Sequence, residues 1–164
     1  MKNDELCVLG VDPGASGAIA FFFPSRPELI SAEDVPLAAG EIDAAALARR
    51  INQLRPTMAV IEQVAAMPGQ GVSSTFKFGA AYGVVRGVVT ALEIPTQLVT
   101  PRTWKRHFRL EADKEKARAL AIRLWPASRH FERKRDHDRA EAALIARYGA
   151  EVLWTDAKAS KEIA

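Results

Sequence analysis

Cysteine is almost absent from this chain of 164 residues, in which Cys7 is the only one. One cysteine can form no disulfide within the chain, and it cannot build a zinc site of the thiolate type. Cys7 stands in a short apolar run, so we interpret it as a small buried hydrophobic side chain. A lack of disulfides is typical of a reducing compartment, and we expect a cytoplasmic location.

Long hydrophobic runs are also missing. The longest run near the N-terminus, residues 18–23, stops at Pro24 and is far shorter than the roughly 20 residues that cross a bilayer. Residues 1–5 lead directly into a strand pattern and lack the layout of a secretory signal. We therefore expect no membrane segment.

The length and the composition fit one compact domain. Hydrophobic residues make up 48% of the chain and charged residues 26%, as in globular proteins. A chain of this length can build one core but not two comfortable ones. Because no repeat or linker divides it, we predict a single domain over residues 1–164, with 155–164 as a frayed polar tail.

Positive charge is concentrated in one stretch. Residues 102–135 contain 12 Lys or Arg against 4 Asp or Glu, a net charge of +8, whereas the remainder of the chain is net acidic. The same stretch also carries Trp104, Phe108, Trp125 and Phe131. Such a patch favours a polyanionic partner such as nucleic acid, although an ordinary solvated helix surface would look similar.

The hydrophobic pattern predicts an α/β fold. Apolar runs predict strands, and capped or amphipathic segments predict helices. Because Glu33 and Asp34 make the third strand polar, we predict that it lies at an edge of the sheet. We expect Ser73 or Ser74 to cap the long helix and Gly149 to end the last one. The expected strands are 6–12, 18–23, 29–36, 57–61 and 96–99, and the expected helices are 43–55, 73–92, 100–108, 113–125 and 136–148.

The long helix carries a stripe of glycines, Gly79, Gly83 and Gly87, spaced four apart. Each glycine costs a helix about 1 kcal/mol relative to alanine. Such a stripe is tolerated where another backbone must approach closely. The sequence leaves two partners open, namely the sheet of the same chain and a helix of a second copy.

Two predicted strands end in a carboxylate. Asp12 ends the first strand, before a Gly-rich turn at 13–17, and Glu62 follows the strand 57–61. A buried carboxylate is costly unless a cation or hydrogen bonds compensate it. Asp12 could merely cap the turn, and Glu62 could be solvent-exposed. The repeated pattern favours a shared site, because the carboxyl ends of neighbouring strands line the functional crevice of an α/β sheet.

A third pair of carboxylates opens the last helix. Asp138 and Glu141 are three residues apart, so they share a helix face. The same spacing is also a capping box, and both interpretations stay open. Clustered carboxylates suit Mg²⁺ or Mn²⁺ rather than zinc. Beside a basic stretch that can neutralise phosphates, a pair of such ions fits phosphodiester cleavage, and we interpret the chain as a nuclease.

Several segments in order resemble the RuvC-type Holliday junction resolvases of bacteria and phages, within the RNase H-like superfamily. The similarity covers about residues 6–150, and its segments are 8–14, 60–64, 73–92, 114–118 and 138–146. The resemblance implies an RNase H-like mixed five-stranded sheet flanked by helices on both faces. It also implies a homodimer that cuts four-way DNA junctions by paired symmetric nicks and depends on Mg²⁺, for which we expect Mn²⁺ to substitute.

The resemblance also assigns roles to residues. The family's acidic positions match Asp12, Glu62, Asp138 and Glu141. On this basis we expect Asp12 to bridge two metal ions, one also held by Glu62 and the other by Asp138 and Glu141. The resemblance implies two lysines near the scissile phosphate, which match Lys105 and Lys116. The further DNA-binding residues that we expect around these lysines are Arg102, Arg106 and Lys114.

The sequence departs from the family pattern at several places. Glu141 stands where the family usually has Asp, and either Asp136 or His137 could replace Asp138 as a ligand. Ala65 occupies the position of the family's aromatic wedge, for which Met67 or Phe76 could substitute. Two other functions stay open, a branched-DNA-binding protein without catalysis and an actin-like or sugar-kinase-like phosphotransferase. The phosphotransferase would need a second related domain.

Overall fold

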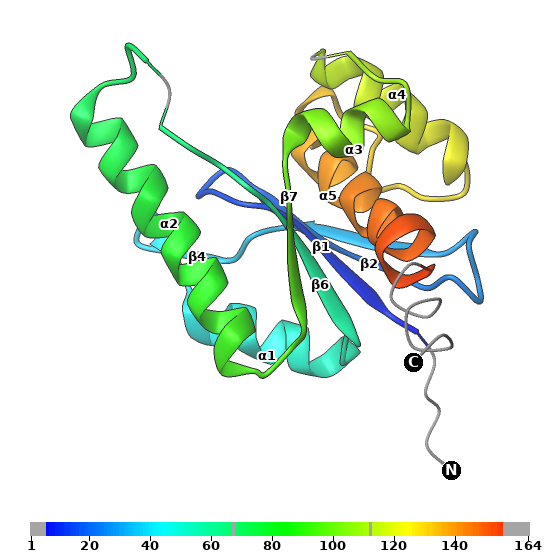
Figure 1. Ribbon diagram of the computed structural model, residues 1–164, viewed down its shortest axis with the longest axis horizontal. Helices are drawn as coiled ribbons and strands as arrows, with labels where there is room; N and C mark the ends of the chain where they lie inside the picture. Colours follow the sequence, from blue (N-terminus) through cyan, green and yellow to red (C-terminus); the bar gives the residue numbers. More distant parts are fainter. Residues whose placement is uncertain (1–5, 67, 112, 156–164) are drawn as a thin grey trace.

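A computed structural model describes residues 6–66, 68–111 and 113–155 (Figure 1). Met67 and nearly all of the predicted polar tail lie outside the described residues. The strands are β1 (Val8–Asp12), β2 (Ala18–Phe22), β3 (Ile30–Asp34), β4 (Leu37–Ala38), β5 (Glu41–Ile42), β6 (Met58–Glu62) and β7 (Thr96–Val99). The α-helices are α1 (Ala44–Leu54), α2 (Val72–Ala91), α3 (Pro101–His107), α4 (Lys114–Leu124) and α5 (His137–Tyr148).

Five strands form one mixed sheet in the order β3-β2-β1-β6-β7. The pairs β1–β2 and β2–β3 are antiparallel, while β1–β6 and β6–β7 are parallel. The predicted mixed five-stranded sheet is therefore confirmed, and β3 is an edge strand as its acidic residues indicated. The small hairpin β4–β5 was not predicted, because strands of two residues show no alternation that a sequence pattern can reveal.

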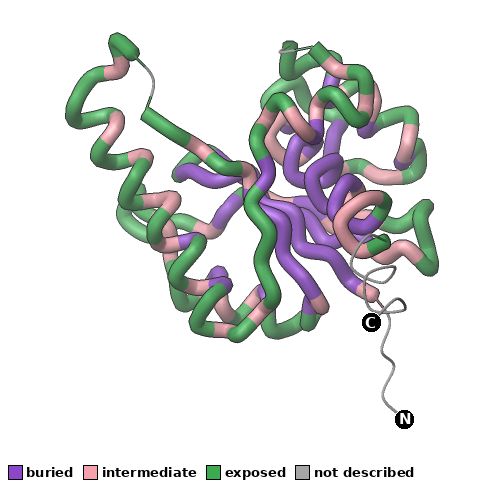
Figure 2. Tube along the Cα trace, in the orientation of Figure 1, coloured by how far each residue is buried: buried purple, intermediate pink, exposed green. Residues whose placement is uncertain are grey.

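Helices cover both faces of the sheet, as predicted (Figure 1). Successive side chains of a strand point to opposite faces, so β1 contributes to two separate cores. Val8 packs on the side of α5, whereas Leu9 and Val11 pack on the side of α1 and α2. Figure 2 shows β1, β2, β6 and α5 as the most buried parts of the molecule, while β7 and much of α2 are exposed.

Three predicted helix starts are confirmed by their caps. The side chains of Asp43, Thr100 and Asp113 each accept a hydrogen bond from a backbone N–H of the helix that follows. The expected serine cap of α2 is wrong. That helix begins at Val72 after Gly71, which has no side chain to accept the bond.

The last helix begins earlier than the capping-box interpretation requires. A 3₁₀ turn, Lys134–Asp136, leads directly into α5 at His137. Asp138 and Glu141 therefore both lie inside the helix, and Asp138 is not its cap. The predicted end is confirmed, since α5 ends at Tyr148 and Gly149 is its C-cap. Gly149 keeps right-handed backbone angles, with φ −57°, and the chain continues as a π-helical turn, Gly149–Leu153.

Two glycines let α5 lie unusually close to the sheet. A Cβ atom on Gly10 would stand 2.2 Å from the carbonyl oxygen of Ala142 and 2.4 Å from the amide nitrogen of Ala146. A Cβ atom on Gly149 would stand 2.5 Å from Cγ2 of Val60. Both positions exclude any larger side chain, so glycine in β1 and at the end of α5 fixes how near this helix comes to the strands.

The glycine stripe of α2 does not pack on the sheet. Gly79, Gly83 and Gly87 are all exposed, and a Cβ on any of them would meet no described atom within 4 Å. The only buried residues of α2, Val85 and Val89, lie toward its C-terminal end. Of the two partners that the sequence left open, the chain's own sheet is therefore excluded for the described residues.

In the described part of the chain, no helix has the length and apolar character needed to cross a membrane.

Candidate metal centre

Asp12 and Glu62 end two neighbouring strands. The parallel register of β1 and β6 pairs Val11 with Ile61, so the next residue in each strand, Asp12 and Glu62, stand side by side at the carboxyl end of the sheet. Because side chains alternate along a strand, Asp12 points to the same face as Gly10, the face on which α5 lies. The fold therefore directs the Asp12 carboxylate toward the last helix.

The last helix supplies two further carboxylates at this point. Asp12, Asp138 and Glu141 each offer an oxygen atom, and these oxygens all lie within 4.8 Å of one another. Asp12 is only 9% exposed and Glu141 only 3%. Residues separated by 126 positions in the chain thus form one compact acidic cluster, as predicted from the strand end and from the helical spacing. Glu62 lies beside this cluster.

Two carboxylates of the centre, Asp12 and Glu62, have a raised pKa. Burial raises the pKa of Asp12 well above its ordinary value, and the charges of Glu141, Glu62 and Asp138 raise it further. Burial also raises the pKa of Glu62, against a hydrogen bond from Trp104 that lowers it. Like charges held this close favour a bound cation, because a cation removes both the repulsion and the cost of burial.

Two lysines face the acidic cluster. The Nζ atom of Lys105 lies 2.8 Å from Oε1 of Glu141. The Nζ atom of Lys114 donates a hydrogen bond of 2.7 Å to Oδ1 of Asp138 and lies 3.7 Å from Oε2 of Glu141. Burial alone would lower the pKa of Lys114, but the hydrogen bond and the charge of Asp138 outweigh it, and the pKa is raised. Two ammonium groups therefore partly neutralise the carboxylates.

The donor set fits a hard divalent cation. All the candidate ligands are carboxylates, which Mg²⁺ and Mn²⁺ prefer. In addition, the buried Oε1 atom of Glu141 accepts no hydrogen bond of suitable geometry from the described residues, so its contact with Lys105 is an ion pair only. A buried oxygen that lacks a hydrogen bond is costly and is well suited to coordinate an ion.

Of the two alternative ligands, Asp136 is engaged elsewhere and His137 contacts the cluster only through Asp138. Asp136 accepts hydrogen bonds from the backbone N–H and the guanidinium of Arg133, and its pKa is lowered because these bonds outweigh burial. The Nδ1 atom of His137 lies 2.8 Å from Oδ1 of Asp138, so His137 touches the cluster through Asp138. In the described residues, the carboxylates that converge are Asp12, Asp138 and Glu141, with Glu62 adjacent.

The predicted DNA-binding residues differ in their positions. Lys105 and Lys114 reach the acidic cluster. Lys116 instead pairs with Glu111 at the surface. Arg102 and Arg106 are exposed on α3 beside Lys105, where they line a shallow surface hollow. The structure thus brings Lys114, rather than Lys116, next to the carboxylates.

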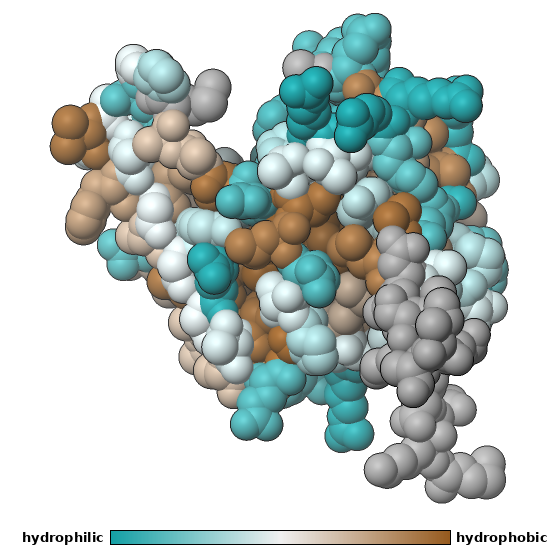
Figure 3. Space-filling view, in the orientation of Figure 1, coloured by the Kyte–Doolittle hydropathy of each residue, from teal (hydrophilic) through white to brown (hydrophobic). Residues whose placement is uncertain are grey.

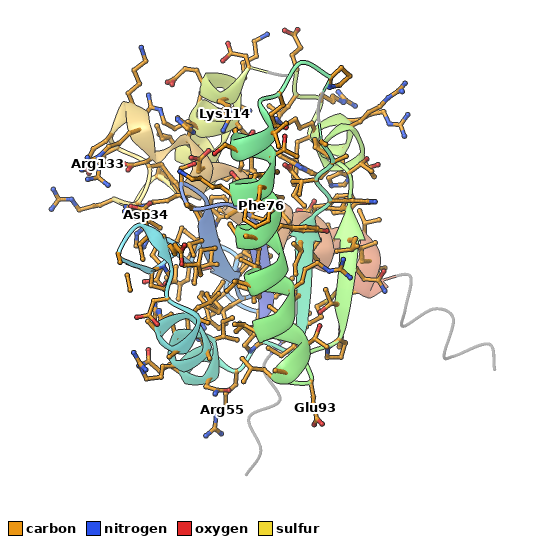
Figure 4. All side chains as sticks on the ribbon, turned by 90° about the vertical axis from the view of Figure 1, so that its left-hand side faces the viewer. Asp34, Arg55, Phe76, Glu93, Lys114 and Arg133 are labelled. Carbon is orange, nitrogen blue, oxygen red and sulfur yellow. The ribbon has the colours of Figure 1, made fainter. Side chains whose placement is uncertain are left out.

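The wedge candidates can be placed only in part. Ala65 is exposed in the loop after β6, and Met67 lies outside the described residues. Phe76 is 77% exposed, and Val72, one turn earlier on α2, is 88% exposed. Figure 3 shows hydrophobic side chains at the surface over this end of α2, and Figure 4 places Phe76 on its outer side, below Lys114. The ring of Phe76 lines a pocket together with Ala15, three residues after Asp12.

Sequence reasoning missed one residue of the centre. Trp104 is fully buried, and its indole Nε1–H donates a hydrogen bond of 2.7 Å to Oε2 of Glu62. The sequence showed only a tryptophan within a basic segment, which is equally typical of a nucleic-acid surface. The signal that could have identified it is its place on the first turn of a short helix that directly follows a strand beside β6.

Comparison with solved structures identifies the fold. The chain is similar to Thermus thermophilus RuvC in complex with a Holliday junction substrate, with a TM-score of 0.63 and 18% identity over 89% of this chain and 95% of that one. It is also similar to the Fowlpox virus resolvase in complex with Holliday junction DNA, with a TM-score of 0.52 and 13% identity over 90% of this chain and 99% of that one.

A third similar structure is the yeast mitochondrial Holliday junction resolvase Ydc2, with a TM-score of 0.52 and 17% identity over 87% of this chain and 76% of that one. No family model matches the chain, and no curated protein matches it significantly. The RNase H-like fold and the resemblance to RuvC are therefore confirmed at the level of the fold.

Proposed function

We propose that this protein is a Mg²⁺-dependent endonuclease that resolves four-way DNA junctions by paired symmetric nicks. One observation carries the proposal, which is the convergence of Asp12, Asp138 and Glu141 within 4.8 Å at the end of a RuvC-like sheet. The basic stretch 102–135 supplies the two lysines that border this cluster. A carboxylate cluster bordered by cations suits a reaction at a phosphodiester.

The carboxylates hold the metal. We assign Asp12 as the ligand shared by two ions, Glu62 as a further ligand of one, and Asp138 with Glu141 as ligands of the other. When bound, the ions supply positive charge at the scissile phosphate and lower the pKa of water. Mn²⁺ satisfies the same oxygen ligands and is expected to substitute.

The lysines have two tasks in this proposal. Without an ion, Lys105 and Lys114 compensate the buried negative charge of Glu141 and Asp138. With an ion in place, that compensation would no longer be needed, and both ammonium groups would be available to a DNA phosphate. Arg102, Arg106 and Lys116 lie further out and would hold the DNA backbone, which carries no sequence information.

We propose that the protein acts as a homodimer through α2, in the cytoplasm. The glycine stripe of α2 is exposed and leaves room for another backbone, and none of the residues 72–84 is buried. β7 is an edge strand of the sheet, and its Leu98 is 39% exposed. A second copy would cover these small and apolar surfaces, and two active sites would account for a pair of nicks.

The test compares labelled four-way junctions with linear duplex of the same sequence, in Mg²⁺ and then in EDTA. We expect nicking of the junction in Mg²⁺ only. Asp12→Asn should bind the junction as the wild type does but should not nick it, whereas the distant exposed control Glu93→Gln should do both. Nicking by Asp12→Asn at the wild-type rate would contradict the metal assignment.

The same assay decides between the alternatives. Junction binding without nicking in any divalent ion would identify a non-catalytic branched-DNA-binding protein. The phosphotransferase alternative needs two related domains around a nucleotide, whereas the described residues build one five-stranded sheet and a two-stranded hairpin. Tight binding of ATP in a thermal-shift assay would support it nonetheless.

A further inference from the structure

A buried tryptophan connects the two halves of the acidic centre. Trp104 is 0% exposed, and its indole Nε1–H donates to Oε2 of Glu62 over 2.7 Å. The next residue, Lys105, places its Nζ atom 5.2 Å from the centroid of the Trp104 ring and 2.8 Å from Glu141. The edge of the Trp104 ring thus contacts Glu62, at the end of a strand. The face of the same ring contacts Lys105, which pairs with Glu141 on the last helix.

The position of Trp104 follows from the fold. Thr100 caps α3, Pro101 occupies its first turn, and this short helix starts directly after β7, the neighbour of β6. The tryptophan on this helix is therefore held beside the end of β6, where Glu62 stands. A buried ring has little freedom to move, so the direction of its N–H bond is fixed.

We propose that Trp104 is a positioning residue that orients the Glu62 carboxylate for metal binding. Its hydrogen bond engages Oε2 and leaves Oε1 as the oxygen that would coordinate an ion. By holding Lys105 over its ring, it also keeps the ammonium group at Glu141. This inference rests on the proposed metal-dependent function and adds to it a residue that does not itself touch the ion.

The expected effect is a loss of metal affinity. Removing a group that hydrogen-bonds to a metal ligand and orients it typically lowers the affinity for the metal by about 10- to 100-fold. Trp104→Phe keeps an aromatic ring but removes the N–H donor, so we expect Mn²⁺ affinity, measured by calorimetry without DNA, to fall by about tenfold or more.

The chain offers a matched control for this variant. Trp125 is also 0% exposed, and its Nε1–H donates to the backbone oxygen of Pro27 over 3.0 Å. Trp125→Phe therefore removes the same donor from an equally buried site that lies away from the carboxylates. We expect it to lower thermal stability but to leave Mn²⁺ affinity unchanged. Equal Mn²⁺ affinities of the two variants would overturn the role of Trp104 and leave the proposed function standing.

A double-mutant cycle shows whether Trp104 acts through Glu62. Glu62→Gln removes the charged ligand, so adding Trp104→Phe to it should cause little further loss of Mn²⁺ affinity. Independent, additive losses would overturn the proposal. If the wild type binds no divalent ion at all, the metal centre itself is wrong, and the role of Trp104 falls with it.

Fluorescence tests the same inference without changing the centre. In the variant Trp125→Phe, Trp154→Phe, the only tryptophan left is Trp104. Its emission should shift when Mg²⁺ saturates the protein, because the carboxylate that accepts its hydrogen bond gains a cation. An unchanged emission spectrum at a Mg²⁺ concentration that calorimetry shows to be saturating would overturn the proposal, even if Trp104→Phe failed to fold.

Discussion

Replacing Asp12 by asparagine should make the metal-free protein more stable while it abolishes activity. Asp12 is 9% exposed, and burial together with three neighbouring carboxylates raises its pKa. Its charge is therefore unfavourable in the folded state at neutral pH. Asparagine has nearly the same shape but carries no charge, so the substitution removes this repulsion and keeps the packing.

The structure sets the scale of the gain. Two unit charges 4.8 Å apart, the outer limit of separation in this cluster, repel by about 3.5 kcal/mol at an effective dielectric constant of about 20. Asp12 has two such neighbours, Asp138 and Glu141. Attraction to Lys114 and screening by water offset most of this repulsion, and we expect a net gain of about 1–2 kcal/mol in the free energy of unfolding.

The assay is thermal unfolding in EDTA and in Mg²⁺. For a chain of this size, a gain of about 1–2 kcal/mol raises the melting temperature by about 2–8 °C. In Mg²⁺ the order should reverse, because an ion at 100 times its dissociation constant stabilises the wild type by about 2.7 kcal/mol. The variant lacks the shared ligand and should gain little.

The control is Glu93→Gln, which removes an exposed carboxylate at the end of the molecule opposite Lys114 (Figure 4). Its melting temperature should equal that of the wild type in both buffers. A lower melting temperature of Asp12→Asn in EDTA would refute the reasoning, because it would mean that the charge of Asp12 is compensated within the metal-free fold.

Three further predictions follow from the same contacts. The pKa of Asp12 is raised above its ordinary value of 3.8, so the folded protein keeps the proton of this carboxyl to a higher pH than the unfolded chain does. The stability difference between Asp12→Asn and the wild type should therefore shrink as the pH falls through the raised pKa. Measurements of unfolding at several pH values test this. Lys114→Met should reduce the nicking rate at least tenfold, whereas Lys116→Met, which removes a surface cation, should mainly weaken junction binding and make its dependence on salt concentration shallower. Gly83→Leu adds bulk where the helix is exposed, so it should leave the monomer folded and weaken dimerisation in analytical ultracentrifugation.

Much of the fold could be predicted because its signals are local. The strands that end at Asp12 and Glu62 are short apolar runs, and Asp43 and Asp113 cap helices by chemistry that acts within a few residues. The start of α2 could not be predicted, because its N-cap residue, Gly71, has no side chain that could form a capping hydrogen bond. Gly149 caps the end of α5 as predicted, but the sequence could not show that a side chain at this position would also collide with Val60.

The convergence of the carboxylates could be predicted because Asp12 and Glu62 end apolar strands, and Asp138 and Glu141 share one face of a helix. The cations were harder to assign. Lys114 and Lys116 stand on the same short helix, and a segment with this many charges does not show which lysine turns inward. Lys114 faces Asp138 and Glu141 only because α4 packs against α5, which is a tertiary fact. The hydrogen bond from Trp104 to Glu62 joins residues 42 positions apart, and no periodic pattern in the sequence indicates such a contact.

The distance between β1 and α5 connects the fold to the chemistry. The carboxylates that β1 and β6 carry to the end of the sheet can meet those of α5 only if the helix lies almost on the strand. Gly10 permits this, because any Cβ there would collide with the backbone of Ala142 and Ala146. Gly10→Ala should therefore push the helix away from Asp12 and loosen the cluster. We expect Mn²⁺ affinity to fall in that variant even though no ligand has changed, and an affinity equal to that of the wild type would show that the close approach is a matter of packing alone.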